Sequence, residues 1–306
     1  MKEIDNIKGV IPAMITTFDK NEEIDFQRAR NFVEHLINKG ANGLYITGST
    51  GEGFFMDSQE RKAYAECVIE AVNKRVPVIV HIGAIGTKIS IDLAKHAQSI
   101  GADAISSVPP FYYGYSEEDL FHYYKDISDA VDLPMIVYNI SLAGLMNNKL
   151  IEKLATIKNV KGLKFTGREH DDMCALKEKL GKSFMVYSGC DEMATQGLLA
   201  GADGLIGSTY NLMCETFVSI YELAQKEEYV EAFKIQKVAT SLIKCMLVAD
   251  FIPTLKACIR HLGVDVGFAR RPFIEPASEQ FEQVLTSVRK LKEKKESSKI
   301  DFIKNL

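Results

Sequence analysis

A short apolar run at residues 160–166 contains a lysine, Lys164. Such a run predicts a buried strand, and burial disfavours the charged form of an amine. At the ordinary pKa near 10.4, roughly 4 in 10,000 lysine amines are neutral at pH 7. A buried lysine loses its proton more readily and can then attack a carbonyl carbon. We interpret Lys164 either as a Schiff-base nucleophile or as a strand residue whose ammonium reaches solvent or a carboxylate.

Residues 48–53 form a glycine-rich segment around two hydroxyl side chains, Ser49 and Thr50. The segment lacks the Gly-Lys-Ser/Thr ending of a nucleotide-binding loop and the G-x-G-x-x-G order, which disfavours nucleotide binding. Backbone N–H groups and hydroxyls that converge in such a loop suit a small anion, for example a carboxylate. The alternative is a tight turn between a strand and a helix.

Tyr138 follows the apolar run 134–137, where a buried phenol normally packs in the core. If Tyr138 lies beside Lys164 on an adjacent strand, its hydroxyl could carry a proton to or from a substrate oxygen. Asp191 and Glu192 are adjacent in the chain and therefore point in different directions, unlike the paired carboxylates of a glycosidase. A charge role at a helix N-terminus is the alternative for these two residues.

The elements that must position these residues alternate regularly along the chain. Short β-branched runs with flanking glycines predict eight buried parallel strands at residues 9–16, 43–47, 76–83, 103–108, 134–139, 160–166, 183–189 and 204–208. Amphipathic helices are predicted between them at residues 25–39, 58–73, 89–100, 116–130 and 191–200. Predicted helix N-caps are Asp25, Ser58 and Ser116, and predicted C-terminal glycines are Gly40, Gly101 and Gly201. Eight alternations favour an α/β fold of the (β/α)8 TIM barrel type over an open doubly wound sheet.

The last third of the chain predicts only helices, at residues 214–248, 252–262 and 277–295. We therefore assign residues 1–210 to the barrel strands and most barrel helices. Residues 211–306 are assigned to the last barrel helix and a C-terminal helical extension that packs on the barrel as one unit. The lysine- and serine-rich stretch 290–306 predicts a frayed helix end.

Composition narrows the class of protein. Lysine and arginine number 37 against 41 acidic residues, so the net charge is −4 and nucleic acid is not an expected partner. The N-terminus has no signal-peptide core and no window nears 18 apolar residues, which predicts a cytoplasmic protein without a membrane partner. The six cysteines are scattered singly, as reduced thiols are. The histidines form no H-E-x-x-H motif, so neither a metal nor a cofactor is expected.

Five motifs in this order resemble those of the N-acetylneuraminate lyase branch of the dihydrodipicolinate synthase superfamily. The likeness runs from about Lys8 to about Pro276. The motifs are Gly48-Ser49-Thr50-Gly51-Glu52, Tyr138-Asn139-Ile140, Leu163-Lys164-Phe165-Thr166, Gly189-Cys190-Asp191-Glu192 and Gly207-Ser208-Thr209-Tyr210-Asn211.

The resemblance implies a class I aldolase on a (β/α)8 barrel, assembled as a homotetramer, that cleaves N-acetylneuraminate to N-acetylmannosamine and pyruvate. By motif, Lys164 would form the Schiff base, so that no metal is needed. Ser49 and Thr50 would hold the carboxylate of the 2-keto acid. Tyr138 would be the proton relay. Tyr112 matches a tyrosine that reaches into the site of a neighbouring subunit.

The resemblance also implies which branch of the superfamily the chain follows. Positions that match those holding the hydroxyl-bearing tail of the sugar are Thr166, Gly189, Asp191, Glu192 and Ser208. Dihydrodipicolinate synthases typically carry an arginine after the Tyr-Asn pair, where this chain has Ser141-Leu142-Ala143-Gly144, so a sugar acid is favoured. Two positions depart from sialate lyases: Ser141 replaces a proline and Cys190 replaces an aromatic residue. The alternatives are another 2-keto acid aldolase, such as dihydrodipicolinate synthase or a keto-deoxy sugar acid aldolase, and a non-catalytic sensor or scaffold.

Overall fold

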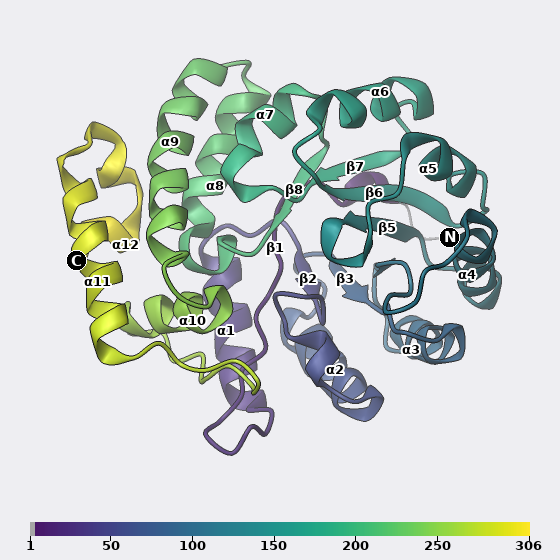
Figure 1. Ribbon diagram of the computed structural model, residues 1–306, viewed down its shortest axis with the longest axis horizontal. Coiled ribbons are helices and arrows are strands. Elements are labelled where there is room, and N and C mark those ends of the chain that lie inside the picture. Colours follow the sequence, from purple (N-terminus) through teal and green to yellow (C-terminus); the bar gives the residue numbers. More distant parts are fainter. Residues whose placement is uncertain (1–3) are drawn as a thin grey trace.

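The protein is described by a computed structural model that covers residues 4–306. Eight parallel strands stand at its centre and helices surround them (Figure 1). The strands are β1 (Gly9–Pro12), β2 (Leu44–Ile46), β3 (Val78–His81), β4 (Ala104–Ser107), β5 (Met135–Ile140), β6 (Val160–Thr166), β7 (Met185–Ser188) and β8 (Gly204–Gly207). Their order is β1-β8-β7-β6-β5-β4-β3-β2. A parallel bridge between Ala13 and Tyr45 joins the two end strands, so the predicted (β/α)8 barrel is confirmed.

Helices connect the strands and cover the outside of the barrel (Figure 1). They are α1 (Phe26–Asn38), α2 (Ser58–Val72), α3 (Thr87–Ser99), α4 (Glu117–Ala130), α5 (Asn148–Leu154), α6 (His170–Leu180), α7 (Ala194–Leu199) and α8 (Tyr210–Gln225). Short 3-10 helices occur at η1 (Ile4–Asn6), η2 (Gly53–Phe55), η3 (Ser141–Ala143) and η4 (Asp191–Met193). The predicted caps Asp25 and Ser116 are confirmed, whereas Asp57 caps α2 in place of Ser58. Asp57 is the N-cap because its side chain accepts hydrogen bonds from the backbone N–H groups of Gln59 and Glu60, and the Glu60 side chain completes a capping box with it.

Two hydrophobic clusters lie on either side of the sheet. The inner cluster fills the barrel with side chains that alternate along the strands, such as Ile11, Ile79, Ile136 and Ile206, all fully buried. The outer cluster packs the helices against the sheet. Burial on both faces explains why the strands read as continuous apolar runs.

The C-terminal third adds α9 (Tyr229–Met246), α10 (Phe251–His261), α11 (Ser278–Arg289), η5 (Lys290–Glu293), η6 (Lys295–Lys299) and α12 (Asp301–Lys304). The predicted helix 214–248 is in fact two helices, α8 and α9. The predicted fraying of residues 290–306 was wrong, because Ile300, Phe302 and Ile303 are fully buried. Three apolar side chains anchor this stretch in spite of its many lysines.

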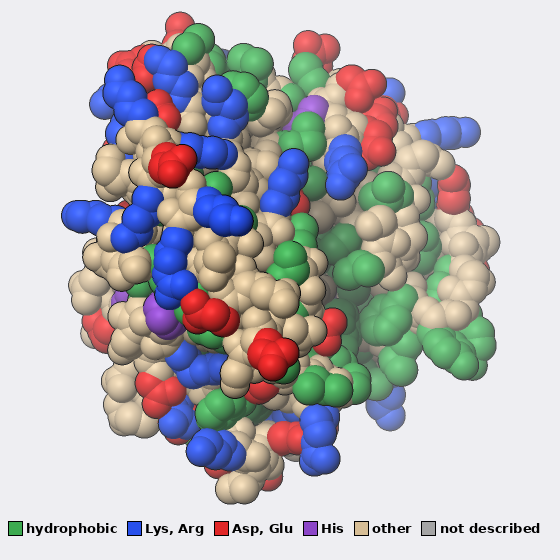
Figure 2. All heavy atoms as spheres, turned by 60° about the vertical axis from the view of Figure 1, so that its left-hand side comes forward, with side chains coloured by type: hydrophobic (Ala, Val, Ile, Leu, Met, Phe, Trp, Pro, Cys, Tyr) green, Lys and Arg blue, Asp and Glu red, His purple; other side chains and the backbone are tan. Residues whose placement is uncertain are grey.

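Figure 2 shows the face built by the C-terminal elements, where basic and acidic side chains are interspersed, and beside it a hollow bordered by hydrophobic side chains. Within residues 4–306, no helix combines the length and the apolarity needed to cross a membrane.

Candidate active site

Lys164 lies in the interior of the barrel on β6, with 4% of its surface exposed. Its ammonium nitrogen Nζ is 3.9 Å from the centroid of the Tyr138 ring and 4.5 Å from that of the Tyr45 ring. Among the described residues it forms no salt bridge. Burial lowers the pKa of Lys164 to about 7, and the charge of Asp191 opposes this shift. A far larger share of this amine is then neutral at pH 7 than of an ordinary lysine, which meets the first requirement of a nucleophilic amine.

Tyr138 is the direct neighbour of Lys164 across β5 and β6. Tyr138 therefore lies beside Lys164 on the adjacent strand, which is the arrangement that proton transfer by its hydroxyl would need. Burial raises the pKa of Tyr138, while the nearby hydroxyls of Thr166 and Ser49 act in the opposite direction. A phenol with a raised pKa stays protonated, so it can donate a proton as well as pass one on.

The loop that follows Tyr138 carries Ser141 in place of the expected proline. The loop begins with η3 and is closed by the side chain of Asn139. Asn139 donates to the carbonyl of Met146 at 3.0 Å and accepts from the Met146 N–H at 2.9 Å. These two bonds hold the strand end without a proline, because Asn139 is almost fully buried and both of its polar groups are satisfied.

Ser49 and Thr50 lie in the turn between β2 and η2. The Thr50 and Ser208 hydroxyls share a hydrogen bond of 2.6 Å, which joins the ends of β2 and β8. Gly53 is required here, since a Cβ atom would lie 2.0 Å from the Thr47 carbonyl oxygen. Within residues 4–306, the backbone N–H groups of Ser49 and Thr50 donate to no backbone carbonyl. Two hydroxyls and two open N–H groups can receive a carboxylate.

A buried ion pair holds Glu52 at the end of this turn, and it was not predicted from the sequence. Lys256, fully buried on α10, donates to the Glu52 carboxylate and, at 2.7 Å each, to the carbonyls of Thr16 and Phe268. The other carboxylate oxygen of Glu52 accepts from the Arg270 N–H at 2.7 Å. Every donor of the ammonium therefore has an acceptor, as a buried charge requires. Sequence spacing gave no signal for this pair, because its members are 204 residues apart.

The end of β7 presents Asp191, which is 6% exposed. Its Oδ2 atom accepts from the N–H and the hydroxyl of Thr209 at 2.8 and 2.7 Å, whereas Oδ1 is buried without a hydrogen-bond partner among the described residues. Burial raises the pKa of Asp191 to about 6. Burial likewise raises the pKa of the Cys190 thiol, to about 11. The two bonds from Thr209 hold this buried carboxylate in one position.

A cavity of about 200 Å³ opens beside this carboxylate. Its walls are Gly189, Asp191, Glu192, Ser208, Thr209, Ile243, Leu247 and Phe251. Thr166 and Lys164 both lie close to Gly189. A Cβ atom added to Gly189 would lie 2.0 Å from the Thr166 hydroxyl and 3.3 Å from the Lys164 Cε atom. The structure thus brings the tail residues predicted from the resemblance, which are Thr166, Gly189, Asp191, Glu192 and Ser208, to one side of Lys164.

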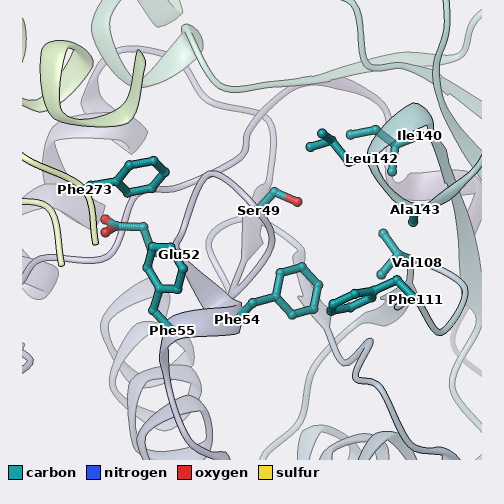
Figure 3. A pocket seen from close by; sticks show the side chains of 10 residues that line it. All are labelled: Ser49, Glu52, Phe54, Phe55, Val108, Phe111, Ile140, Leu142, Ala143 and Phe273. Atoms are coloured by element: carbon teal, nitrogen blue, oxygen red, sulfur yellow. The ribbon is translucent and has the colours of Figure 1, made fainter. Parts of the chain in front are cut away.

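A second hollow, of about 240 Å³, is mainly apolar (Figure 3). Ser49 lies between its two sides, with its hydroxyl directed towards the side that carries Val108, Ile140, Leu142 and Ala143. The rings of Phe54 and Phe111 meet edge to face at 4.9 Å, as do those of Phe55 and Phe273 at 5.3 Å. This hollow gives the Ser49 turn a largely apolar border.

Tyr112 is the predicted site residue that is most exposed to solvent. It is 85% exposed, lines neither hollow and has a left-handed backbone with φ of 89°. Such a backbone is costly for a residue other than glycine and is found where function or packing demands it.

Two further residues surround the lysine and were not singled out from the sequence. Tyr45 forms part of the wall beneath the ammonium. His81 packs edge to face against Tyr138 and is fully buried, and burial lowers its pKa well below the usual value. Both lie within predicted strands, and only the barrel interior shows that they face Lys164. Residues 4–306 contain no cluster of three or more His, Cys, Asp or Glu side chains that could hold a metal ion.

The fold and the buried strand-end lysine define an enzyme of the aldolase type on a (β/α)8 barrel. Residues 6–291 match the model of the dihydrodipicolinate synthetase family, and the chain belongs to this family. Its members are lyases that include N-acetylneuraminate lyases and dihydrodipicolinate synthases.

Solved structures from both branches are similar to this chain. N-acetylneuraminate lyase from Mycoplasma synoviae is 31% identical, with a TM-score of 0.87 over 95% of this chain and 99% of that one. A catalytic lysine mutant of the sialic acid aldolase from Ruminococcus gnavus is 29% identical, with a TM-score of 0.92 over 98% and 100%. Dihydrodipicolinate synthase from Bacillus anthracis is 28% identical, with a TM-score of 0.88 over 94% and 98%.

Proposed function

We propose that this protein is a class I aldolase that cleaves N-acetylneuraminate to N-acetylmannosamine and pyruvate. The observation that carries the proposal is Lys164, a buried lysine without an ion pair among the described residues, whose pKa is about 7 and whose strand neighbour is Tyr138. The neutral amine attacks the C2 ketone of the substrate, water leaves, and the protonated imine becomes the electron sink.

The C3–C4 bond then breaks as Tyr138 relays the proton from the C4 hydroxyl. N-acetylmannosamine leaves, and an enamine of pyruvate remains on Lys164. Protonation at C3 and hydrolysis of the imine release pyruvate and restore the amine. Ser49 and Thr50 hold the carboxylate throughout, because their hydroxyls and open N–H groups belong to one turn.

The cavity beside Asp191 supports a sugar acid as the substrate. Its polar wall offers carboxylates and hydroxyls that pair with the hydroxyl groups of a polyol tail. The loop after Tyr138 presents Ser141, Leu142 and Ala143, none of which can form the bidentate bond that arginine makes with a second carboxylate. The names of the sialic acid aldolase and N-acetylneuraminate lyase relatives point the same way.

Cys190 favours a second candidate in the same class, a keto-deoxy sugar acid that lacks the acetamido group. A cysteine in place of an aromatic residue offers less surface to an acyl substituent. Comparing kcat/KM for N-acetylneuraminate with that for simpler keto-deoxy acids decides between the two candidates.

The exposed Tyr112 supports the proposal of a homotetramer in which this tyrosine completes the site of a neighbouring subunit. Its side chain is exposed and lines neither of the two hollows described above. A cytoplasmic location is proposed from the sequence.

Trapping of the imine tests the central step. Borohydride added with pyruvate should reduce the Schiff base and leave a covalent adduct on Lys164, detected by mass spectrometry of peptides. Lys161→Ala is the matched control, since Lys161 lies half-buried on the same strand. An adduct that persists in Lys164→Ala, or no adduct in the unaltered protein, rejects the mechanism. Pyruvate release from N-acetylneuraminate then tests the substrate.

A further inference from the structure

Helix α9 lies outside the barrel, yet one buried side chain links it to the β7 end. Gln236 is 1% exposed. Its Nε2 atom donates to the main-chain carbonyl of Asp191 at 2.9 Å, and its Oε1 atom accepts from the Thr195 N–H at 3.3 Å. The Gln236 amide therefore links the first residue of η4 to the first turn of α7.

Thr240, one turn further along α9, extends this link. Its hydroxyl donates to the Glu192 carbonyl at 3.1 Å and accepts from Gln236 Nε2 at 3.0 Å. The carbonyls of Asp191 and Glu192 are thus both held from α9, while Thr209 holds the Asp191 side chain. Several buried hydrogen bonds that share one amide restrict it to one geometry.

The same stripe of α9 also reaches the cavity. Residues 236, 240, 243 and 247 are spaced by four, three and four, which places them on one face of a helix. Ile243 of α9 and Leu247, the C-cap residue of this helix, line the same cavity as Asp191 and Glu192. One helix therefore sets both the position of the polar wall and the surface that faces it.

We propose that Gln236 is a positioning residue that fixes the selectivity of the enzyme for an aldehyde with a long hydroxyl-bearing tail. The inference rests on the proposed function, because it takes Asp191 and Glu192 to be the residues that hold the tail. The hydrogen bonds of Gln236 reach Asp191, Thr195 and Thr240, and none reaches Lys164, Ser49 or Thr50. Disturbing it should weaken tail binding and leave the reaction with pyruvate in place.

Gln236→Leu tests this inference in the direction of condensation. Leucine is one bond shorter than glutamine and carries neither of the two polar atoms. With pyruvate as the donor, kcat/KM for N-acetylmannosamine should fall about tenfold, chiefly through KM, the effect of losing one to two buried hydrogen bonds. The value for glyceraldehyde, which lacks the tail, should stay within about twofold. Borohydride trapping of pyruvate should be unchanged.

Variants of Thr240 keep the test decisive if Gln236→Leu folds poorly. Thr240→Val, which removes the hydroxyl, should shift the ratio of the two kcat/KM values in the same direction, and Thr240→Ser should restore it. Ser241→Ala is the control, because the Ser241 hydroxyl donates to Lys237 within the same helix.

Equal losses for both aldehydes would show a merely structural role, and an unchanged ratio in Gln236→Leu and Thr240→Val would show no role. Either result overturns the inference alone. Failure of the unaltered protein to trap pyruvate or to use N-acetylmannosamine overturns the proposed function and this inference together.

Discussion

Tyr138 and Lys164 are paired in register on neighbouring strands, and the lysine ammonium lies 3.9 Å from the centre of the tyrosine ring. The ring covers the amine on one side and thereby contributes to the burial that lowers its pKa. The same tyrosine brings a hydroxyl close to Ser49 and Thr166. One side chain therefore serves both the burial of the nucleophile and the proposed transfer of the proton.

Tyr138→Phe separates these two contributions. The phenyl ring keeps Lys164 covered, so borohydride trapping of pyruvate should persist. Without the hydroxyl, kcat for cleavage should fall about 10²- to 10³-fold, the usual effect of removing a general acid–base group. Tyr187→Phe is the control, since the Tyr187 hydroxyl donates to the Ile7 carbonyl at the other end of the barrel. If kcat of Tyr138→Phe stayed within about threefold, another group would have to relay the proton.

The pH dependence of cleavage should follow the Lys164 amine. Only the neutral amine reacts, so kcat/KM should fall as the pH drops below about 7, the pKa of Lys164. The charge of Asp191 raises this pKa, and Asp191→Asn should therefore move the acid limb of the profile to lower pH, whatever it does to the maximum. Asp171→Asn, which removes an exposed carboxylate from α6, should leave the limb in place. If the acid limb of the profile did not move in Asp191→Asn, the limb would report the titration of a group other than Lys164.

Gly189→Ala should damage the site through a single methyl group. The added Cβ would lie 2.0 Å from the Thr166 hydroxyl and 3.3 Å from Lys164 Cε, so Thr166 must move and the lysine has less room. We expect kcat/KM to fall at least about tenfold and the free energy of unfolding to drop by about 1–3 kcal/mol, the range for overpacked sites. Gly114→Ala, at a position with nothing within 4 Å, should change neither. Thermal unfolding and steady-state kinetics measure both effects, and a fully active Gly189→Ala would contradict this geometry.

Tyr112 should act across a subunit interface. Alone, Tyr112→Phe and Lys164→Ala should each be nearly inactive, with a loss of about 10²-fold or more for the tyrosine variant. Mixed oligomers made by co-expressing the two variants should regain activity, because some sites then combine Lys164 of one subunit with Tyr112 of another. Tyr113→Phe, an exposed neighbour, is the control. Mixed oligomers that stay inactive would place Tyr112 outside the site.

The barrel could be predicted from the sequence because each buried strand and each amphipathic helix carries a local pattern. That pattern gave eight strands in the right order and placed Lys164, Tyr138 and Asp191 at strand ends, where (β/α)8 enzymes carry their sites. The local pattern was also misleading: the lysine-rich stretch after residue 290 was expected to fray, but four of its apolar side chains are buried, three of them fully.

Only the tertiary structure decided how these residues meet. The register between β5 and β6 placed Tyr138 beside Lys164, and enclosure by the barrel, with Tyr45 and His81 packed nearby, lowered the pKa of the amine. The Lys256–Glu52 pair and the contacts of Gln236 join segments 204 and 45 residues apart. Periodicity reports which face of an element is buried, whereas partners distant in the chain are chosen by packing and by the need to satisfy every buried polar group.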